Sequence, residues 1–257
     1  MYEIEPVPRT RADVMPATDS EREAQIPAPA SKRKWLTASV VNDAAAVVAQ
    51  IFDEAERRDP DHQQTWVALL DGNNHQIDRI NAEAKARSVP VTVTVDFIHV
   101  LEYVWKAAWS FYREGDPTAE LWVRRHAQNI LAGKATQVAG QIRRQATNTG
   151  LDPTQRTGAD TCAAYLTNKH AYLDYPTALR NGWPIATGVI EGACRHLIWR
   201  AVCQVGVVDF ALLALLRGGC GRLGWWRSGR LCATRGQTDM RGFGVPQDHG
   251  SSWGAAV

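Results

Sequence analysis

Trp66-Val-Ala-Leu-Leu-Asp-Gly72 is an apolar run of strand length that ends in an acid and a glycine. A second run, Val91-Thr-Val-Thr-Val-Asp96, is rich in β-branched residues and also ends in an acid. Between the two runs, residues 73–88 carry apolar side chains at helical spacing. A strand, a helix and another strand in this order predict neighbouring parallel strands, and therefore an α/β fold.

The same alternation extends upstream to Trp35. Residues 35–41 (Trp-Leu-Thr-Ala-Ser-Val-Val) fit a strand, and Asn42 is a suitable cap for a following helix with apolar residues near i, i+4 and i+8. We therefore expect a largely parallel sheet with helices between its strands.

An all-helical block follows Phe97. We predict helices over residues 97–113, 118–131, 135–148 and about 156–180, because Gly and Pro interrupt the helical spacing between them. Aromatic residues at helical spacing are more typical of a core than of a base-stacking surface. The aromatic residues in question are Tyr103, Trp105, Trp109, Phe111, Tyr112 and Trp122.

The two ends of the sequence differ from this regular middle. Residues 1–33 begin with Tyr2-Glu-Ile-Glu, which fits the end of a strand, and continue as a Pro-rich surface segment. Residues 199–257 contain 11 Gly, 7 Arg and no Lys, and only Val207–Leu216 fits a buried helix. We expect this tail to be poorly ordered, either as an out-of-frame product of a GC-rich gene or as a native Gly/Arg-rich arm for nucleic acid.

Composition and charge exclude several classes of protein. The 257 residues are 45% hydrophobic and 22% charged, as in ordinary globular proteins. We find no apolar window of membrane-span length and no signal-peptide core, and therefore expect a cytoplasmic protein. Five cysteines without a C-x-x-C pair indicate neither a zinc site nor a disulfide framework. The net charge of +2 combines −2 for residues 1–198 with +4 for the tail, so charge alone does not indicate a DNA-binding body.

Three acids suggest a site. Asp71 and Asp96 follow predicted strands, at the edge of an α/β sheet where ligands bind, and Glu191 lies near the start of an apolar, helix-like segment. Such acids are typical of metal-dependent phosphoryl transfer. Simpler roles stay open, since Asp71 and Asp96 can each cap a helix and His99 fits a core histidine. Glu191 is also favourable near a helix start whatever its function.

The motifs around these acids resemble those of bacterial insertion-sequence transposases of the DDE type, in the Mutator-like branch. The resemblance runs from about Lys34 to Leu197 and is carried by Val67-Ala-Leu-Leu-Asp-Gly-Asn73 and by Trp183-Pro-Ile-Ala-Thr-Gly-Val-Ile-Glu-Gly-Ala-Cys-Arg-His-Leu197. It implies an incomplete RNase H-like mixed sheet with an all-helical insertion before the last catalytic acid.

The resemblance also implies roles for individual residues. Asp71 and Glu191 match the second and third catalytic acids, which would hold Mg²⁺ or, in its place, Mn²⁺. Asp96 and His99 match a supporting D-x-x-H motif. The implied partners are DNA, as element ends and target, and further copies of the chain, with no membrane. The implied location is the bacterial cytoplasm, at the nucleoid. The implied segments are 1–33, a partial hairpin and linker; 34–97 and 183–198, the two core parts; 98–182, the helical insertion; and 199–257, the tail.

Two departures from the family pattern predict an inactive chain. The first catalytic acid is expected on a hairpin strand upstream of Trp35, yet Asp13 and Asp19 lie in Pro-rich context and neither ends a predicted strand. After Leu197 the resemblance stops. We therefore expect a transposase fragment, truncated at its start and frameshifted at its end, that lacks one catalytic acid.

Two alternatives remain. The chain could be a non-catalytic remnant that binds DNA or an intact transposase, or an unrelated Mg²⁺ phosphohydrolase built on Asp71 and Asp96. Basic residues near the core supply the candidate DNA contacts, although surface roles are equally open to them. The candidates are Lys32, Arg33, Lys34, Arg195 and His196.

Overall fold

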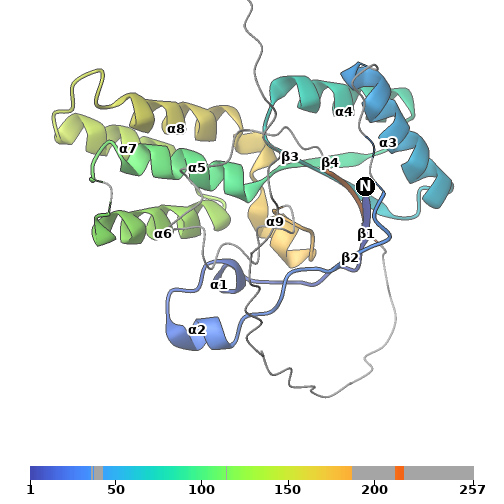
Figure 1. Cartoon of the computed structure of the whole chain (residues 1–257), viewed down its shortest axis with the longest axis horizontal. Coiled ribbons are helices and arrows are strands. Elements are labelled where there is room, and N and C mark those ends of the chain that lie inside the picture. The colour runs from blue at the N-terminus through green and yellow to red at the C-terminus, as the bar shows by residue number, and fades with distance from the viewer. Residues whose placement is uncertain (36, 38–42, 114, 187–211, 217–257) are drawn as a thin grey trace, which may run out of the picture. The chain divides into compact units, whose positions relative to one another are not determined.

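A computed structural model gives the fold (Figure 1). It describes residues 1–35, 37, 43–113, 115–186 and 212–216. The chain divides into two units, residues 1–219 and 220–257, and the second lies wholly outside the described residues. The predicted strand at 35–41 also lies outside them except for Trp35 and Thr37, and so does the tail except for Leu212–Leu216.

A five-stranded mixed sheet forms the centre of the first unit. Its order is β2-β1-β5-β3-β4. The strands are β1 (Tyr2–Ile4), β2 (Ser31–Lys32), β3 (Thr65–Leu70), β4 (Val91–Val95) and β5 (Leu212–Leu216). Strands β3 and β4 are parallel, as are β1 and β5, whereas β1–β2 and β3–β5 are antiparallel. The α/β class and the strands at 66–70 and 91–95 are confirmed, but the sheet is mixed rather than largely parallel.

Two helices pack against the sheet through one apolar cluster. They are α3 (Ala44–Arg58) and α4 (Asn74–Ala86). Phe52 on α3 and Ile80 on α4 are buried with Trp66 and Leu70 of β3. The cap of α3 is Asp43, whose side chain accepts a hydrogen bond from the Ala46 amide at 2.8 Å, so the predicted cap, Asn42, is wrong by one residue.

The helical block is confirmed in outline (Figure 1). It consists of α5 (Phe97–Ala108), α6 (Pro117–Leu131), α7 (Ala135–Asn148), α8 (Thr157–Asn168), the 3-10 helix η1 (His170–Tyr172) and α9 (Tyr175–Arg180). The prediction of one helix over 156–180 is wrong, because the chain turns twice after Asn168. Helix α5 also ends five residues before the predicted limit of 113.

A single core joins these helices to the end of β4. Trp105 and Trp122 are buried in it, and Tyr103, Phe111 and Tyr112 pack against it, which confirms a core role for most of the aromatic residues. Trp109 is the exception, since 37% of it is exposed. Gly158 of α8 lies directly against the Lys106 carbonyl of α5, so these two helices are in close backbone contact.

The Pro-rich N-terminal segment is more regular than its sequence predicts. It contains α1 (Arg11–Val14) and α2 (Asp19–Glu23). Asp13 caps the start of α1 by accepting from the Thr10 amide at 2.6 Å, and Asp19 opens α2. Neither acid follows a strand, in agreement with the sequence analysis.

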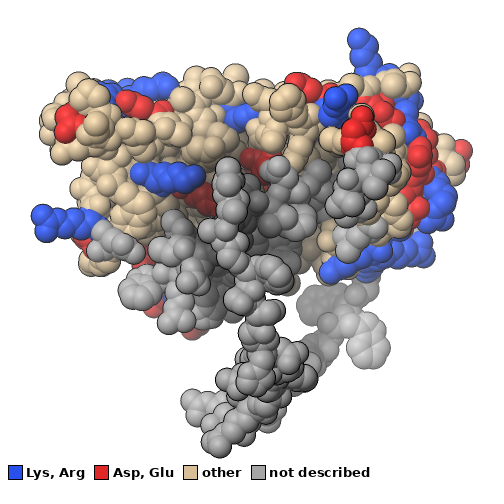
Figure 2. All heavy atoms as spheres, turned by 45° about the horizontal axis from the view of Figure 1, so that its top comes forward, with Lys and Arg blue, Asp and Glu red and all other residues tan. Residues whose placement is uncertain are grey.

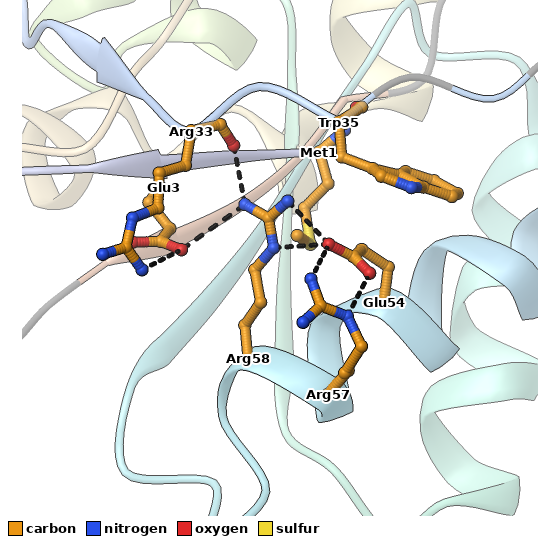
Figure 3. A network of polar contacts seen from close by, with 7 residues as sticks. All are labelled: Met1, Glu3, Arg33, Trp35, Glu54, Arg57 and Arg58. Atoms are coloured by element: carbon orange, nitrogen blue, oxygen red, sulfur yellow. Dashed lines mark hydrogen bonds and ion pairs between the residues drawn. The ribbon is translucent and has the colours of Figure 1, made fainter.

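A buried ionic network ties β1 to α3 and to the segment after β2 (Figure 3). The Arg58 side chain, 11% exposed, contacts Glu3 at 3.4 Å and Glu54 at 2.6 Å and donates to the Arg33 carbonyl at 2.6 Å. Arg57 donates two hydrogen bonds to Glu54, and these bonds hold the pKa of that carboxyl at about 2. The network fixes the short strand β1 against the longest helix on the sheet.

Part of the tail belongs to the sheet. Leu212–Leu216 form strand β5, so the prediction of a helix over 207–216 is wrong at these positions. Strand β5 pairs on both sides and is therefore a central strand. A short apolar run fits a central strand as well as it fits a buried helix. None of the helices in the described ranges combines the length and apolar character needed to cross a bilayer.

Candidate functional site

Two acids follow directly paired residues at one edge of the sheet. Leu70 of β3 and Val95 of β4 are register partners in parallel strands, and Asp71 and Asp96 come next in the chain. The Asp96 amide donates to the Leu70 carbonyl at 2.6 Å, which extends the pairing by one step. Both strand ends were predicted from the sequence, and the parallel register brings the two acids side by side.

Asp71 lies in a turn rather than on a helix. Its Oδ1 accepts a hydrogen bond from the Asn73 amide at 2.7 Å, and Asn73 is the residue that caps α4 by accepting from the His75 amide at 2.9 Å. The interpretation of Asp71 as the helix cap is therefore wrong. The carboxylate is half-buried at the sheet edge, where α/β proteins bind ligands.

Asp96 is a helix cap. Only 4% of the residue is exposed, and its side chain accepts from the Ile98 amide at 2.8 Å at the start of α5. This confirms the capping interpretation. The capping bond fixes the orientation of the carboxylate, which suits a supporting group better than a freely moving metal ligand.

His99 pairs with an acid that the sequence analysis did not select. Its Nδ1 lies 3.4 Å from Glu102 Oε2, one turn further along α5. The hydrogen bond that the His99 ring donates to Glu102 raises the pKa of His99, and the charges of Asp96 and Asp71 raise it further. His99 is only partly buried, so the interpretation as a core histidine is wrong. The i, i+3 spacing of His99 and Glu102 was a signal available in the sequence.

Helix α8 contacts the Asp71 turn through Tyr165. Its hydroxyl donates to the Asp71 carbonyl at 3.0 Å, and its ring stacks on Tyr103 with centroids 3.9 Å apart. Gly72 has a φ of +90°, and a Cβ there would lie 2.5 Å from the Tyr165 hydroxyl. Burial raises the pKa of Tyr165, and nearby negative groups add to the shift, so the hydroxyl stays protonated as a donor.

The same helical block brings a lysine to the site. Lys169 is 8% exposed, and its ammonium donates to Asn74 Oδ1 at the start of α4. Burial lowers its pKa, while the negative charges of Asp78 and Asp71 act in the opposite direction. Tyr165 and Lys169 are four residues apart at the end of α8, but sequence alone gave no reason to pair them with Asp71.

The chain that leads to Glu191 returns to this edge of the sheet. Ile185 is fully buried, and its carbonyl accepts from the Phe97 amide at 2.8 Å, next to Asp96. This stretch of described residues ends at Ala186, so Glu191, Arg195 and His196 lie outside the described residues.

The basic residues 32–34 are exposed but already make contacts within the chain. Lys32 lies 2.7 Å from Glu5, Arg33 lies 3.6 Å from Glu3, and the Lys34 ammonium lies over the Tyr2 ring. The Lys32–Glu5 pair is exposed on both sides and therefore weak, so a phosphate group can replace it. On the face shown in Figure 2, Lys and Arg are interspersed with Asp and Glu and form no single basic surface.

Within the described ranges, no group of three His, Cys, Asp or Glu side chains is arranged to hold a metal ion. The Mg²⁺ ligands that the resemblance implies are Asp71 and Glu191, and Glu191 lies outside the described residues. The chain was also compared with protein-family models, curated proteins and solved structures, and none of them matches.

Proposed function

We propose that this chain is a transposase fragment of an insertion sequence, derived from an enzyme of Mg²⁺-dependent DNA cleavage and strand transfer, and that it does not itself catalyse the reaction. One observation carries the proposal. Asp71 and Asp96 follow paired residues of parallel strands, and the segment before Glu191 returns to the same edge through Ile185. Glu191 is five residues further along the chain than Ala186, a separation of at most about 18 Å.

The described residues can bind and orient but not complete a metal site. In the intact family, Mg²⁺ would stabilise the attacking and leaving oxygens of an in-line phosphoryl transfer. Here Tyr165 holds the Asp71-Gly72 turn, and Asp96 is committed to capping α5. Asp71 is thus the described carboxylate that matches a catalytic acid, and the expectation of inactivity rests on the sequence, in which no residue matches the first acid.

The sheet topology gives a second argument for inactivity. A hairpin strand preceding β1 would pair antiparallel with β1, on the edge that β2 leaves open. Because β1 and β3 run in opposite directions, such a strand would be parallel to β3, and its carboxyl end would meet Asp71 and Asp96. In this chain β5 occupies that position and runs the other way, so the place expected for the first acid is filled by a strand without one.

A nicking and strand-transfer assay tests the proposal. The substrate is DNA carrying the ends of the parent element, with Mg²⁺ or Mn²⁺, and the control is the Asp71→Ala/Glu191→Ala double variant. We expect the native chain to give no more product than this control. Robust turnover that either single substitution abolishes would refute the claim of inactivity. Phosphatase activity that survives Glu191→Ala would instead favour the phosphohydrolase built on Asp71 and Asp96.

A non-catalytic DNA-binding role is the second candidate. Helix α7 favours it, because this helix contains no acid and exposes Arg143 and Arg144, which can contact phosphates. We expect weak binding to duplex DNA that decreases steeply between about 50 and 200 mM salt. The Arg143→Glu/Arg144→Glu variant should abolish it. Binding that does not respond to salt or to this variant would contradict the role.

A further inference from the structure

Strand β5 occupies the centre of the sheet although it comes from the far end of the chain. It pairs with β1 on one side, with Ala214 opposite Tyr2, and with β3 on the other, with Ala214 opposite Val67. Among the strands that the structure describes, β5 alone connects the β1–β2 pair to the β3–β4 pair. Without it, no strand that the structure describes would join the two pairs by main-chain hydrogen bonds.

The position between β1 and β3 offers unsatisfied main-chain groups to any strand that enters. Strand β3 pairs with β4 along one edge, so its other edge would be open in the absence of β5. Open edges of buried strands bind further strands, because their amide and carbonyl groups need partners. Pairing with β5 over five residues of β3 meets that need.

On its β3 side this position is lined by apolar residues on both faces of the sheet, whereas β1 contributes Glu3 of the ionic network opposite Leu215. Residues Trp66 to Leu70 of β3 are at most 1% exposed. Trp66, Ala68 and Leu70 belong to the cluster shared with α3 and α4, whereas Val67 packs with Ile4 on the other face. A strand that enters here therefore meets apolar residues of β3 on both faces, and the apolar run Leu212-Leu-Ala-Leu-Leu216 suits this position.

We propose that the gap between β1 and β3 is a binding site for an extended apolar strand. In this chain Leu212–Leu216 occupies the site, and a separate peptide of the same sequence binds there once the chain's own strand is displaced. Main-chain hydrogen bonds supply affinity in this mode of binding, and the apolar faces select the side chains. The inference rests on strand pairing and burial and does not depend on the proposed function.

A proline in β5 should empty the site between β1 and β3, so that the empty site can be compared with the occupied one. Ala214 pairs on both sides, and proline there removes a main-chain donor from a central strand. In the full-length Ala214→Pro variant, we expect the amides of β1 and β3 to exchange hydrogen about 100-fold faster than in the native chain. The amides of α5–α8 should keep their protection and serve as the internal control. Ala233→Pro places the same substitution elsewhere in the tail and should leave β1 and β3 protected.

The peptide test uses a labelled copy of residues 211–217. The native chain holds its own strand at a high effective concentration, so the peptide competes poorly with it. We expect Ala214→Pro to bind the peptide at least about 10-fold more tightly than the native chain, with β1 and β3 protection restored. Equal affinity for the two proteins, or unchanged exchange of β1 and β3 in Ala214→Pro, would overturn the proposal.

A cross-linking experiment decides the matter if Ala214→Pro loses protection throughout α5–α8 as well. V67C/A214C places cysteines at register partners of β3 and β5, and V67C/L213C shifts the pair by one residue. A one-residue shift moves the side chain to the opposite face, so only the first variant should form the bond under mild oxidation. Equal cross-linking in both variants, or none in V67C/A214C, would show that Leu212–Leu216 does not occupy the site.

Discussion

Replacing Gly158 by alanine tests the packing of α8 on α5, the contact that brings Tyr165 and Lys169 to the Asp71 turn. A Cβ at position 158 would lie 2.3 Å from the Lys106 carbonyl oxygen, 3.0 Å from its carbon and 3.1 Å from Ser110 Oγ. The first two atoms belong to the backbone of α5, so they cannot turn away as the end of a flexible side chain can. The two helices must therefore move apart.

The sign of the effect depends on two opposing terms. Alanine in place of glycine gains up to about 1 kcal/mol of helix propensity, and less near a helix end. Overpacking against a fixed neighbour costs about 1–3 kcal/mol, and a contact as short as 2.3 Å belongs at the upper end. We expect Gly158→Ala to lower the free energy of unfolding by about 2 kcal/mol.

Gly140→Ala is the matched control within the same helical block. A Cβ at position 140 would meet only the end of the Arg144 side chain, at 3.4 Å, so we expect a gain of about 0.5–1 kcal/mol. Urea unfolding followed by far-UV circular dichroism measures both variants. If Gly158→Ala unfolded at the same urea concentration as the native chain or at a higher one, the close contact of α5 and α8 would be wrong.

Three further predictions concern ionisable groups. Arg58→Met should lower the free energy of unfolding by about 3 kcal/mol in urea unfolding, because Glu3 and Glu54 lose a buried partner, whereas Arg57→Met should have a smaller effect since Arg57 is largely exposed. Glu102→Gln should lower the pKa of His99 in an NMR titration, and an unchanged pKa would contradict the pairing of His99 with Glu102. This pairing stabilises the fold fully below about pH 6.5, and the stabilisation is lost as pH rises through the raised pKa of His99. Burial lowers the pKa of His126, so the neutral ring's contribution to the stability of the fold is complete above about pH 6.5 and is lost as pH falls through the lowered pKa. His126→Gln should therefore lose less stability than the native chain between about pH 6.5 and 5.

The strand ends beside the site could be predicted because their signals are local. The apolar run before Asp71 and the β-branched run before Asp96 each have strand length, and the residues between them have helical spacing. Parallel pairing of the two strands then follows from the order of elements. The capping role of Asp96 was also available, since the residue precedes a helical segment.

The other parts of the candidate site depend on contacts between distant residues. Tyr165 is 94 positions from Asp71, and Lys169 is 95 positions from Asn74, so no local pattern relates them. The caps also show the limit of local signals. Asn42 and Asp43 both suit a helix start, and so do Asp71 and Asn73, and only the course of the backbone decides which residue accepts the hydrogen bond. Strand β5 was missed because five apolar residues fit a buried helix as well as a strand.

The position of β5 has a consequence for the order of folding during synthesis. Helices α5–α8 contact one another within residues 97–168 and can pack while the chain is still emerging from the ribosome. The sheet cannot close so early, because Tyr2 pairs with Ala214. Until residue 216 is free, β1 and β3 each have an open edge, and the nascent chain exposes an apolar, aggregation-prone surface to chaperones. Strand β1, although synthesised first, therefore completes its pairing only after β5 has been synthesised.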